Sequence, residues 1–508
     1  MDLISSLSYQ PNELSFGTSG LRGLVTDMTD LECYINTVGF INYLKSTNSE
    51  IKTIAIAGDL RSSTPRILEA IVAAITDQGI EYDYCGLIPT PALAYYAINQ
   101  STPSIMVTGS HIPDDRNGIK YYKSDGEILK SDEAEIKQSV ARVRSRLYSS
   151  TSFDFDAIGR LKTRPTLPEP NLEAETIYKQ RYLDFFDSQA LAGRQIVFYQ
   201  HSAVGRELIP EILINLGAEV IKVGFSEKFI PVDSENIDSD KQEFYHQMAG
   251  KYPDSFAIVS TDGDSDRPLV FDQDGNFQMG DILGLAVARE LGARVVAFPV
   301  SSNNALANYC QDNDINYQLT KIGSPYVIKS LEDSEGQGIK AGWEVNGGFI
   351  LGSDISEAGR QLKALLTRDA TLPIIVSLLA SINQGQSVSE YFKRLTTSYT
   401  QVGLIDNFPV TSSQAIVELL SSRSDNSSKI IEQIFSQEHG FGKYQSIDLT
   451  DGVRILFDNG EIAHIRPSGN APQLRIYSNA TSQARANQIV ELGIKEPDGL
   501  LRQLEQEI

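Results

Sequence analysis

The sequence predicts an α/β fold of several domains, in which short apolar strands alternate with amphipathic helices. The chain has 508 residues, and at roughly 150 residues per domain this length favours three or four domains. Strand and helix patterns alternate in three successive regions. The last region instead shows strands joined by Gly-containing turns. We therefore expect three α/β regions followed by a smaller α+β domain.

The first region begins with apolar residues at helical spacing between 31 and 44, followed by an apolar strand at 53–57. A second helix is predicted to begin at Ser63–Pro65 and to end at Gly79, because proline favours a first turn and glycine a C-terminus. The strand at 104–108 then leads directly into a Gly-Ser-His sequence. Such alternation predicts parallel strands covered by helices.

Similar units recur without a strict sequence repeat. The predicted elements of the next two regions are a strand at 195–199, a helix at 208–216, a strand at 219–223, a strand at 295–300, a helix at 305–310 and a strand at 316–320. In the final region they are strands at 453–457, 462–466 and 474–477 and a helix at 484–492. A polar stretch at 163–172 has the composition of a linker. The expected domains are 1–165, 166–279, 280–396 and 397–508.

The net charge of −22 argues against general nucleic-acid binding, which needs a basic surface. Three widely spaced cysteines give neither a disulfide framework nor a metal-binding spacing. The first fifteen residues have no secretory pattern, and no apolar run approaches the ~18 residues of a membrane span. We therefore expect a cytoplasmic protein without membrane or nucleic-acid partners.

The first loop with chemical potential contains Ser110 and His111, with Lys120 following on the next segment. A serine after a strand and a glycine acts as a nucleophile when a neighbouring group activates it. His111 and Lys120 are candidates for proton transfer or charge stabilisation. A turn with a capping serine explains the pattern about equally well. The Gly-x-Ser-x-Gly pattern of hydrolases is absent.

The second loop has carboxylates at alternate positions, Asp262, Asp264 and Asp266. Three carboxylates this close repel one another unless a cation binds them, and oxygen ligands suit a hard divalent ion. An EF-hand is excluded because Arg267 and Gln273 stand where it requires glycine and glutamate. Mg²⁺ is favoured over Ca²⁺ because three carboxylates leave room for a phosphate oxygen. A solvated acidic turn is the alternative.

The third loop offers Glu344 and Asn346, a carboxylate and an amide able to hydrogen-bond sugar hydroxyls, although an ordinary tight turn explains it equally well. The fourth loop combines two arginines with a hydroxyl, an amide and a glycine turn, which suits phosphate; its residues are Arg466, Ser468, Gly469, Asn470 and Arg475. The alternative there is a hairpin with surface arginines.

These loops, in this order, resemble the α-D-phosphohexomutase superfamily, and the segment Phe16–Gly23 is similar to its N-terminal signature. The resemblance extends from Phe16 to Tyr477. It implies four domains around a central cleft, three related α/β domains with mixed sheets plus the C-terminal α+β domain. It also implies a hexose phosphate substrate, with Mg²⁺ and a hexose 1,6-bisphosphate as activator and intermediate.

The resemblance assigns roles to the candidate residues. Ser110 is the residue phosphorylated, beside His111; a phosphoserine oxygen and Asp262, Asp264 and Asp266 hold Mg²⁺; Arg22, Lys120 and Arg267 surround the transferring group; Glu344 and Asn346 face sugar hydroxyls; and Arg466, Ser468, Gly469, Asn470 and Arg475 hold the idle phosphate. The choice between Lys120 and His111 for proton transfer stays open, as does a monomeric or dimeric state.

Several positions depart from the commonest family pattern. They are Gly109 for alanine, Ile112 for asparagine, Ser265 for glycine, Asn346 for serine, Gly348 for histidine, Asn470-Ala471 for Thr-Glu, and Ser324 where some members have histidine. The sugar-facing positions therefore leave specificity open. Conversion of mannose 6-phosphate to mannose 1-phosphate is our first expectation, glucose phosphate or dual use the second, and glucosamine phosphate the third. A phosphoserine-type sugar phosphatase and a non-catalytic sugar-phosphate sensor are the alternatives from other classes.

Overall fold

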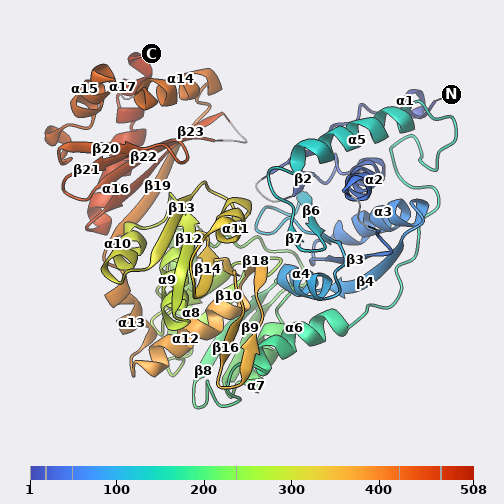
Figure 1. The fold of residues 1–508 in the computed structure, drawn as a ribbon, viewed down its shortest axis with the longest axis horizontal. Helices are drawn as coiled ribbons and strands as arrows, with labels where there is room; N and C mark the ends of the chain where they lie inside the picture. The colour runs from blue at the N-terminus through green and yellow to red at the C-terminus, as the bar shows by residue number, and fades with distance from the viewer. Residues whose placement is uncertain (1, 18–19, 48–49, 236, 423, 469–471) are drawn as a thin grey trace. The chain divides into compact units, whose positions relative to one another are not determined.

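The computed structural model describes residues 2–17, 20–47, 50–235, 237–422, 424–468 and 472–508 (Figure 1). The chain forms two compact units. The larger comprises Met1–Val296 and Gly323–Tyr391, and the smaller comprises Ala297–Ile322 and Phe392–Ile508. Within the described residues, no helix combines the length and the apolar character needed to cross a membrane.

The first sheet of the larger unit has the strand order β1-β2-β6-β5-β3-β4, with β7 paired to β6. Its strands are β1 (Ser15–Phe16), β2 (Leu21–Leu24), β3 (Thr53–Gly58), β4 (Glu81–Leu87), β5 (Ser104–Val107), β6 (Arg116–Lys123) and β7 (Gly126–Glu127). β3 is parallel to β4 and β5, whereas β6 is antiparallel to both β5 and β2. The expectation of parallel strands is thus confirmed for β3, β4 and β5, but the other four pairings of this sheet are antiparallel. The reason is that a connection without a crossover helix returns the chain from β5 into β6.

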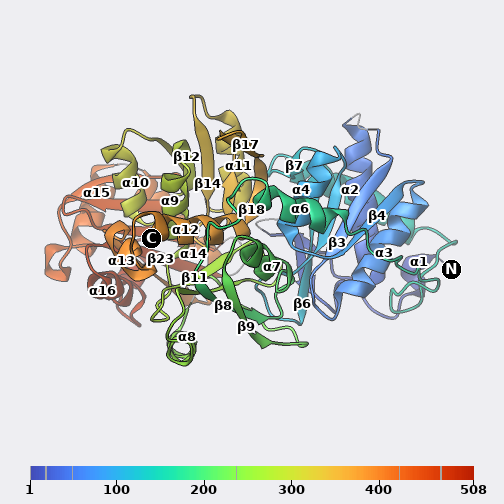
Figure 2. The same ribbon diagram turned by 90° about the horizontal axis from the view of Figure 1, so that it is seen from below.

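The second sheet has the order β11-β10-β8-β9. Its elements are β8 (Gln195–His201), α7 (Leu208–Asn215), β9 (Glu219–Phe225), α8 (Ser239–Lys251), β10 (Ala257–Thr261) and β11 (Pro268–Phe271). β8 is parallel to β9, its neighbour in Figure 2, and to β10, and the predicted strand-helix-strand unit is confirmed. β10 and β11 are antiparallel, so the aspartate loop is the turn that joins them.

The rest of the larger unit contains an antiparallel arrangement of β14, β15 and β18 and a small β16-β17 ribbon. The bounds are α9 (Gly280–Glu290), α11 (Ser324–Asp333), β14 (Ile339–Trp343), β15 (Phe349–Leu351), β16 (Ile355–Glu357), β17 (Arg360–Leu362), β18 (Leu365–Asp369) and α12 (Thr371–Asn383). The Glu344 loop is the turn between β14 and β15. Two elements, β12 (Ala293–Pro299) and α13 (Val388–Leu395), lead from one unit into the other.

The smaller unit contains an antiparallel sheet in the order β19-β23-β22-β21-β20. Its elements are α10 (Asn304–Asp312), β13 (Asn316–Thr320), β19 (Tyr399–Asp406), α14 (Val410–Ser421), α15 (Asp425–Ile434), the 3₁₀ turn Gln437–His439, β20 (Tyr444–Asp448), β21 (Val453–Phe457), β22 (Ile462–Pro467), β23 (Gln473–Ala480), α16 (Gln483–Ile494) and α17 (Leu500–Gln506). The α+β character predicted for the C-terminal region is confirmed.

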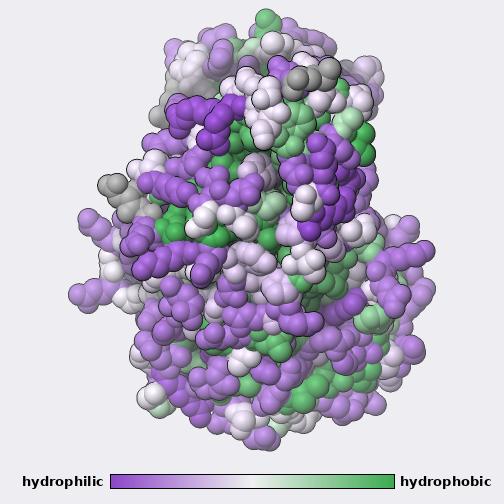
Figure 3. All heavy atoms as spheres, turned by 90° about the vertical axis from the view of Figure 1, so that its right-hand side faces the viewer, coloured by the Kyte–Doolittle hydropathy of each residue, from purple (hydrophilic) through white to green (hydrophobic). Residues whose placement is uncertain are grey.

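Hydrophilic residues cover most of the face shown in Figure 3, with small hydrophobic patches between them, as expected of a chain with a net charge of −22. All three cysteines, Cys33, Cys85 and Cys310, are free and buried. This agrees with the absence of a disulfide pattern in the sequence.

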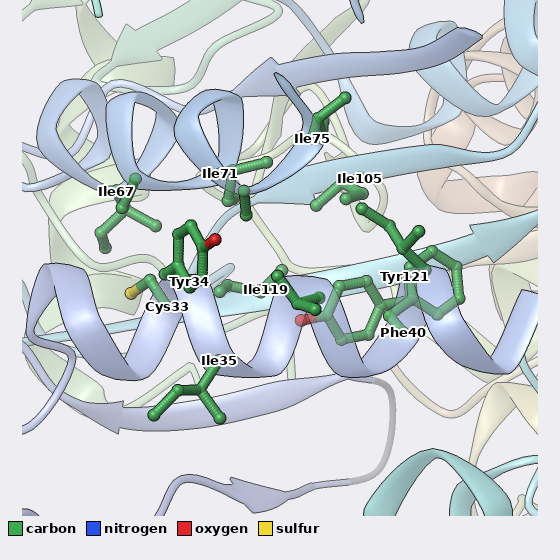
Figure 4. Packing of buried hydrophobic residues seen from close by; sticks show 14 of the residues in the cluster. Cys33, Tyr34, Ile35, Phe40, Ile67, Ile71, Ile75, Ile105, Ile119 and Tyr121 are labelled. Atoms are coloured by element: carbon green, nitrogen blue, oxygen red, sulfur yellow. The ribbon is translucent and has the colours of Figure 1, made fainter. Parts of the chain in front are cut away.

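The core of the first sheet is formed by the inner faces of its central strands and the helices that pack on them. The helices of this part of the chain are α1 (Leu3–Ser6), α2 (Asp30–Ser46), α3 (Thr64–Asp77), α4 (Thr90–Asn99), α5 (Glu133–Tyr148) and α6 (Glu173–Leu183). In Figure 4, Ile67, Ile71 and Ile75 of α3 lie close to the buried side chains of α2. The rings of Phe40 and Tyr121 stack with 4.3 Å between centroids. This packing fixes β5 and β6, the two strands that position Ser110 and Lys120.

Candidate active site

The hydroxyl of Ser110 lies just beyond β5 and contacts the aspartate loop. Its Oγ donates to Asp262 Oδ2 at 2.5 Å, and the residue is buried. Ser110 has a φ of 54°, in the left-handed region, and its N–H donates to Thr108 Oγ1 at 2.8 Å. A non-glycine residue with this φ is uncommon, and surrounding contacts must hold it in place. The hydroxyl is thus next to charged groups, as a nucleophile requires.

Three carboxylates gather in the turn between β10 and β11. Oxygen atoms of Asp262, Asp264 and Asp266 all lie within 4.8 Å of one another, and all three side chains are buried. Ser265 stabilises the turn: it has a φ of 56°, and its Oγ accepts a hydrogen bond from Gly205 N–H at 3.0 Å. The turn therefore brings alternate residues of the sequence to one place.

The aspartate cluster has the properties of a cation site. Burial, together with the charges of Asp264 and Asp266, raises the pKa of Asp262 well above its usual value. Burial acts on Asp264 in the same direction, but Lys120 outweighs it and lowers the pKa of Asp264. Within the described part of the chain, Asp264 Oδ1 and Asp266 Oδ1 are buried without a hydrogen-bond partner. A hard divalent cation prefers oxygen ligands, and a cluster of carboxylate oxygens that includes atoms without a hydrogen-bond partner fits such a cation.

Two basic side chains lie against this cluster. Lys120 Nζ, on β6, is 2.6 Å from Asp264 Oδ2 and 2.7 Å from Asp266 Oδ2. Burial would lower the pKa of Lys120, but these two carboxylates outweigh it and raise the pKa. Arg267 Nε is 3.9 Å from Asp262 Oδ2 and 3.8 Å from Asp266 Oδ1. Both cations are therefore placed to stabilise charge on a group at Ser110.

His111 and Arg22 complete the basic surroundings. His111 Nδ1 is 3.4 Å from Ser110 Oγ, and burial, with the charges of Arg267 and Arg22, lowers the pKa of His111 to about 2. Arg22 lies on β2; burial and then the charges of Arg267 and Arg368 lower its pKa to about 10. His111 is therefore neutral at pH 7, and Arg22 is charged.

The Glu344 loop is joined to the aspartate loop through Arg368. Arg368 Nη1 donates to Glu344 Oε2 at 2.7 Å, and Arg368 Nη2 donates to Asp266 Oδ2 at 2.7 Å. Asn346 Nδ2 donates to Glu235 Oε1 at 3.0 Å, and Asn346 Oδ1 accepts from the N–H of its own loop at Gly348. Glu344 and Asn346 are thus held by neighbours that the sequence did not single out.

The predicted phosphate loop belongs to the smaller unit. Arg466 and Arg475 are directly opposite each other in the β22-β23 ladder, and Arg466 Nε lies 3.0 Å from Asp451 Oδ1. Two like charges in such a pair destabilise a sheet unless an anion lies between or beside them. Ser468 follows β22. Two predicted residues of the phosphate loop, Gly469 and Asn470, lie outside the described residues.

Comparison with known proteins shows the family to which the chain belongs. Models of the phosphoglucomutase/phosphomannomutase family match the chain at 13–147 (alpha/beta/alpha domain I), 278–399 (alpha/beta/alpha domain III) and 408–492 (C-terminal domain). The chain is 42% identical over 484 residues to the phosphomannomutase of Salmonella muenchen, covering 94% of each sequence. The chain belongs to the α-D-phosphohexomutase superfamily. It is accordingly a phosphotransferase of the mutase type.

Other relatives differ in how similar their sequences are to that of this phosphohexomutase. The phosphomannomutase of Sinorhizobium fredii is 37% identical, covering 94% of this chain and 98% of its own. Relatives named phosphoglucosamine mutase, or probable phosphoglucosamine mutase, are 25% to 28% identical. The crystal structure of a putative phosphomannomutase from Thermus thermophilus has a TM-score of 0.71 at 17% identity, covering 95% of this chain and 98% of that one, which shows the shared fold.

The structure of this phosphohexomutase adds four side chains to the site. Arg61 donates to backbone carbonyls of the Ser110 loop, Thr90 Oγ1 donates to Asp264 Oδ2 at 2.6 Å, and Glu235 and Arg368 contact the residues named above. None lies in a Gly-rich motif. The sequence signal for these arginines is a charged residue within an apolar strand, for Arg368, or three residues after the end of one, for Arg61.

Proposed function

We propose that this phosphohexomutase interconverts mannose 6-phosphate and mannose 1-phosphate through a phosphoserine at Ser110. The observation that carries the proposal is the hydrogen bond of 2.5 Å from Ser110 Oγ to Asp262, in a cluster of three carboxylates that Lys120 and Arg267 approach. The choice of mannose is supported by the two relatives named phosphomannomutase, which are more similar than those named phosphoglucosamine mutase. Glucose phosphate is the second candidate substrate.

In the proposed reaction, the phosphoryl group leaves Ser110 Oγ as the free hydroxyl oxygen of the hexose monophosphate bonds to phosphorus. Overall, the proton lost by this hydroxyl ends on Ser110 Oγ, which becomes a free serine hydroxyl, and hexose 1,6-bisphosphate forms. Return of its other phosphoryl group to Ser110 releases the isomeric monophosphate and regenerates the phosphoserine. Because phosphoryl transfer depends mainly on positioning and charge neutralisation, the chain's task is to align the groups and surround the phosphoryl oxygens with cations.

Different residues of the site are proposed to bind the cation, the phosphoryl group, the sugar and the idle phosphate. Asp262, Asp264 and Asp266 fit Mg²⁺, which when bound neutralises phosphoryl oxygen charge. Lys120 and Arg267 supply further positive charge at the same place. We assign further roles as follows: Arg22 to the transferring group, His111 to the neighbourhood of the phosphoserine, Glu344 and Asn346 to sugar hydroxyls, and Arg466, Ser468, Gly469, Asn470 and Arg475 to the idle phosphate.

The nucleophile is tested with Ser110→Ala. We expect mutase activity to fall by at least about a thousandfold, because phosphoryl transfer through the protein is lost, while mannose 6-phosphate still binds in calorimetry. Ser62→Ala, at an exposed serine of the same unit, is the matched control and should keep full activity. Wild-type turnover by Ser110→Ala would remove the nucleophile assignment.

Substrate choice and reaction class are tested together by supplying the 1-phosphates of mannose, glucose and glucosamine in turn, with Mg²⁺ and the matching bisphosphate. We expect kcat/KM to be highest for mannose 1-phosphate, and inorganic phosphate to accumulate far more slowly than the isomer. Preference for glucosamine 1-phosphate would overturn the mannose proposal. Stoichiometric release of inorganic phosphate would make the protein a phosphatase instead.

A further inference from the structure

Arg368 is a buried guanidinium at the end of β18 that no motif in the sequence marks. It is only 2% exposed, although it carries a full charge. Its neighbour along the strand, Asp369, accepts hydrogen bonds from Tyr178 and Tyr182 and takes no part in the aspartate cluster. A charge buried to this degree is retained only where it is paired and hydrogen-bonded, so the contacts of Arg368 indicate what it does.

One end of the guanidinium holds the aspartate loop. Arg368 Nε and Nη2 donate to the same oxygen, Asp266 Oδ2, at 3.2 and 2.7 Å, and Lys120 Nζ lies 2.7 Å from that oxygen. The other oxygen, Asp266 Oδ1, has no hydrogen-bond partner within the described residues. Arg368 therefore fixes which oxygen of Asp266 is left for a cation.

The other end holds the Glu344 loop. Arg368 Nη1 donates to Glu344 Oε2 at 2.7 Å, and both side chains are buried. Because the guanidinium is planar and its donors have fixed directions, a shift of Glu344 changes the position of the donors at Asp266. One side chain thus donates to both carboxylates.

Gly348 makes room for this arrangement. A Cβ atom at residue 348 would lie 2.7 Å from Arg368 Cδ and 2.9 Å from Arg368 Cγ, closer than carbon atoms tolerate. These two carbon atoms lie in the middle of the arginine side chain, so the whole side chain would have to move to relieve the steric clash. The observed position of the Arg368 side chain therefore requires glycine at residue 348.

We infer that Arg368 is a positioning residue that makes divalent-cation binding at Asp262–Asp266 and hexose binding at Glu344 mutually dependent. The inference rests on the proposed function, which puts the sugar at Glu344. A sugar that orders Glu344 also orders Arg368 and Asp266, so the cation then binds a carboxylate already in place. By linkage, the cation tightens sugar binding by the same factor.

The experiment measures that factor without turnover. MgCl₂ is titrated calorimetrically into unphosphorylated protein, with and without mannose 6-phosphate and with no bisphosphate present. In the wild type we expect the sugar phosphate to tighten Mg²⁺ binding by about fivefold or more, and Mg²⁺ to tighten sugar-phosphate binding equally. In Arg368→Met we expect both factors to fall to within about twofold of unity.

Two further variants separate coupling from stability. Gly348→Ala keeps the charge of Arg368 but displaces its side chain, so this variant should also lose the coupling. It tests the inference even if Arg368→Met does not fold. Arg181→Met removes a buried arginine that lies 3.6 Å from Asp369, and it should keep the wild-type factor even if its melting temperature falls.

The outcomes distinguish this inference from the proposed function. Wild-type protein that binds Mg²⁺ but no hexose phosphate would contradict the proposed function itself. Binding of both ligands with no mutual effect in the wild type would overturn the inference alone. So would an undiminished factor in both Arg368→Met and Gly348→Ala.

Discussion

Arg61 packs against the loop that carries Ser110 and donates to four backbone carbonyl groups, three in that loop and one at Arg116, the first residue of β6. The acceptors are Ser110 O at 3.0 Å, Ile112 O at 2.5 Å, Pro113 O at 2.7 Å and Arg116 O at 3.0 Å. The side chain of Arg61 is fully buried. A single guanidinium thus replaces the regular hydrogen bonding that a loop lacks, and it holds the backbone of Ser110 in its left-handed conformation.

Replacement of Arg61 by lysine should therefore impair catalysis more than binding. A lysine ammonium cannot reach four divergent carbonyls, so we expect Ser110 to be displaced and kcat to fall roughly ten- to a hundredfold, with KM changing less than about threefold. Steady-state kinetics with mannose 1-phosphate measures both quantities.

Arg66→Lys is the matched control for this variant. Arg66 also donates to backbone carbonyls, Met28 O at 2.8 Å and Val25 O at 3.3 Å, and to Asp30 Oδ1 at 2.7 Å, and these three acceptors lie outside the Ser110 loop. Its lysine variant should keep kcat near the wild-type value. Equal losses in Arg61→Lys and Arg66→Lys would show that general destabilisation, not loop positioning, is responsible.

At the scale of elements, turns at strand ends bring the site together. Ser110 follows β5, Asp262 follows β10 and Glu344 follows β14. The sequence predicted those loops because glycine, serine and carboxylates interrupt apolar runs. It did not predict Arg61 or Arg368, because their hydrogen-bond partners lie about 50 and 102 residues away in the chain and no local spacing encodes such contacts.

The direction of β6 was equally beyond local reasoning. Apolar patterning predicts that a segment is a strand but not whether it pairs parallel or antiparallel. The antiparallel return of β6 is what places Lys120 opposite Met106 of β5 and against the aspartate cluster. In contrast, β13 and β21 have the predicted bounds, because turn residues flank each apolar run closely.

His464 makes the stability of the β22 region dependent on pH. Its Nε2 donates to Asp451 O at 2.5 Å, and the ring stacks on Tyr477 with 5.3 Å between centroids. Burial lowers the pKa of His464 to about 4. The imidazole is therefore neutral in the fold but takes up a proton in the unfolded chain below a pH of about 6.5.

We expect the smaller unit to lose stability as pH falls from 7 to 5. The unfolded state binds more protons than the folded state between pH 6.5 and 4, so the loss attributable to His464 is about 2 kcal/mol at pH 5. Hydrogen exchange of the β22 and β23 amides at both pH values, corrected for intrinsic rates, measures it. His464→Gln should show a smaller loss; an identical loss would exclude this residue as the cause.

At the scale of the whole molecule, the C-terminal region has a hydrophobic core of its own. The buried cluster there is formed entirely by residues between Ile405 and Leu504, from both the sheet and the helices α14–α17. The family model for the C-terminal domain matches 408–492, inside the same region. The boundaries at 165, 279 and 396 stay predictions, since the chain separates here into two compact units.

We predict that residues 397–508 fold as an isolated fragment. A chain of this size with a complete core buries enough apolar surface for independent stability. Thermal unfolding followed by far-ultraviolet circular dichroism should show a cooperative, reversible transition. A fragment without such a transition would indicate that Ala297–Ile322, the other part of the smaller unit, is required for folding.

The three buried cysteines give the protein natural reporters of conformational opening. Burial raises the pKa of each thiol, and thiolate is the form that reacts with alkylating agents. Iodoacetamide therefore modifies these sulfur atoms only when the chain around them opens. Peptide mapping of a labelling time course measures the rate at which each site opens, with no introduced dye. Cys33 and Cys85 report on the larger unit and Cys310 on the smaller unit.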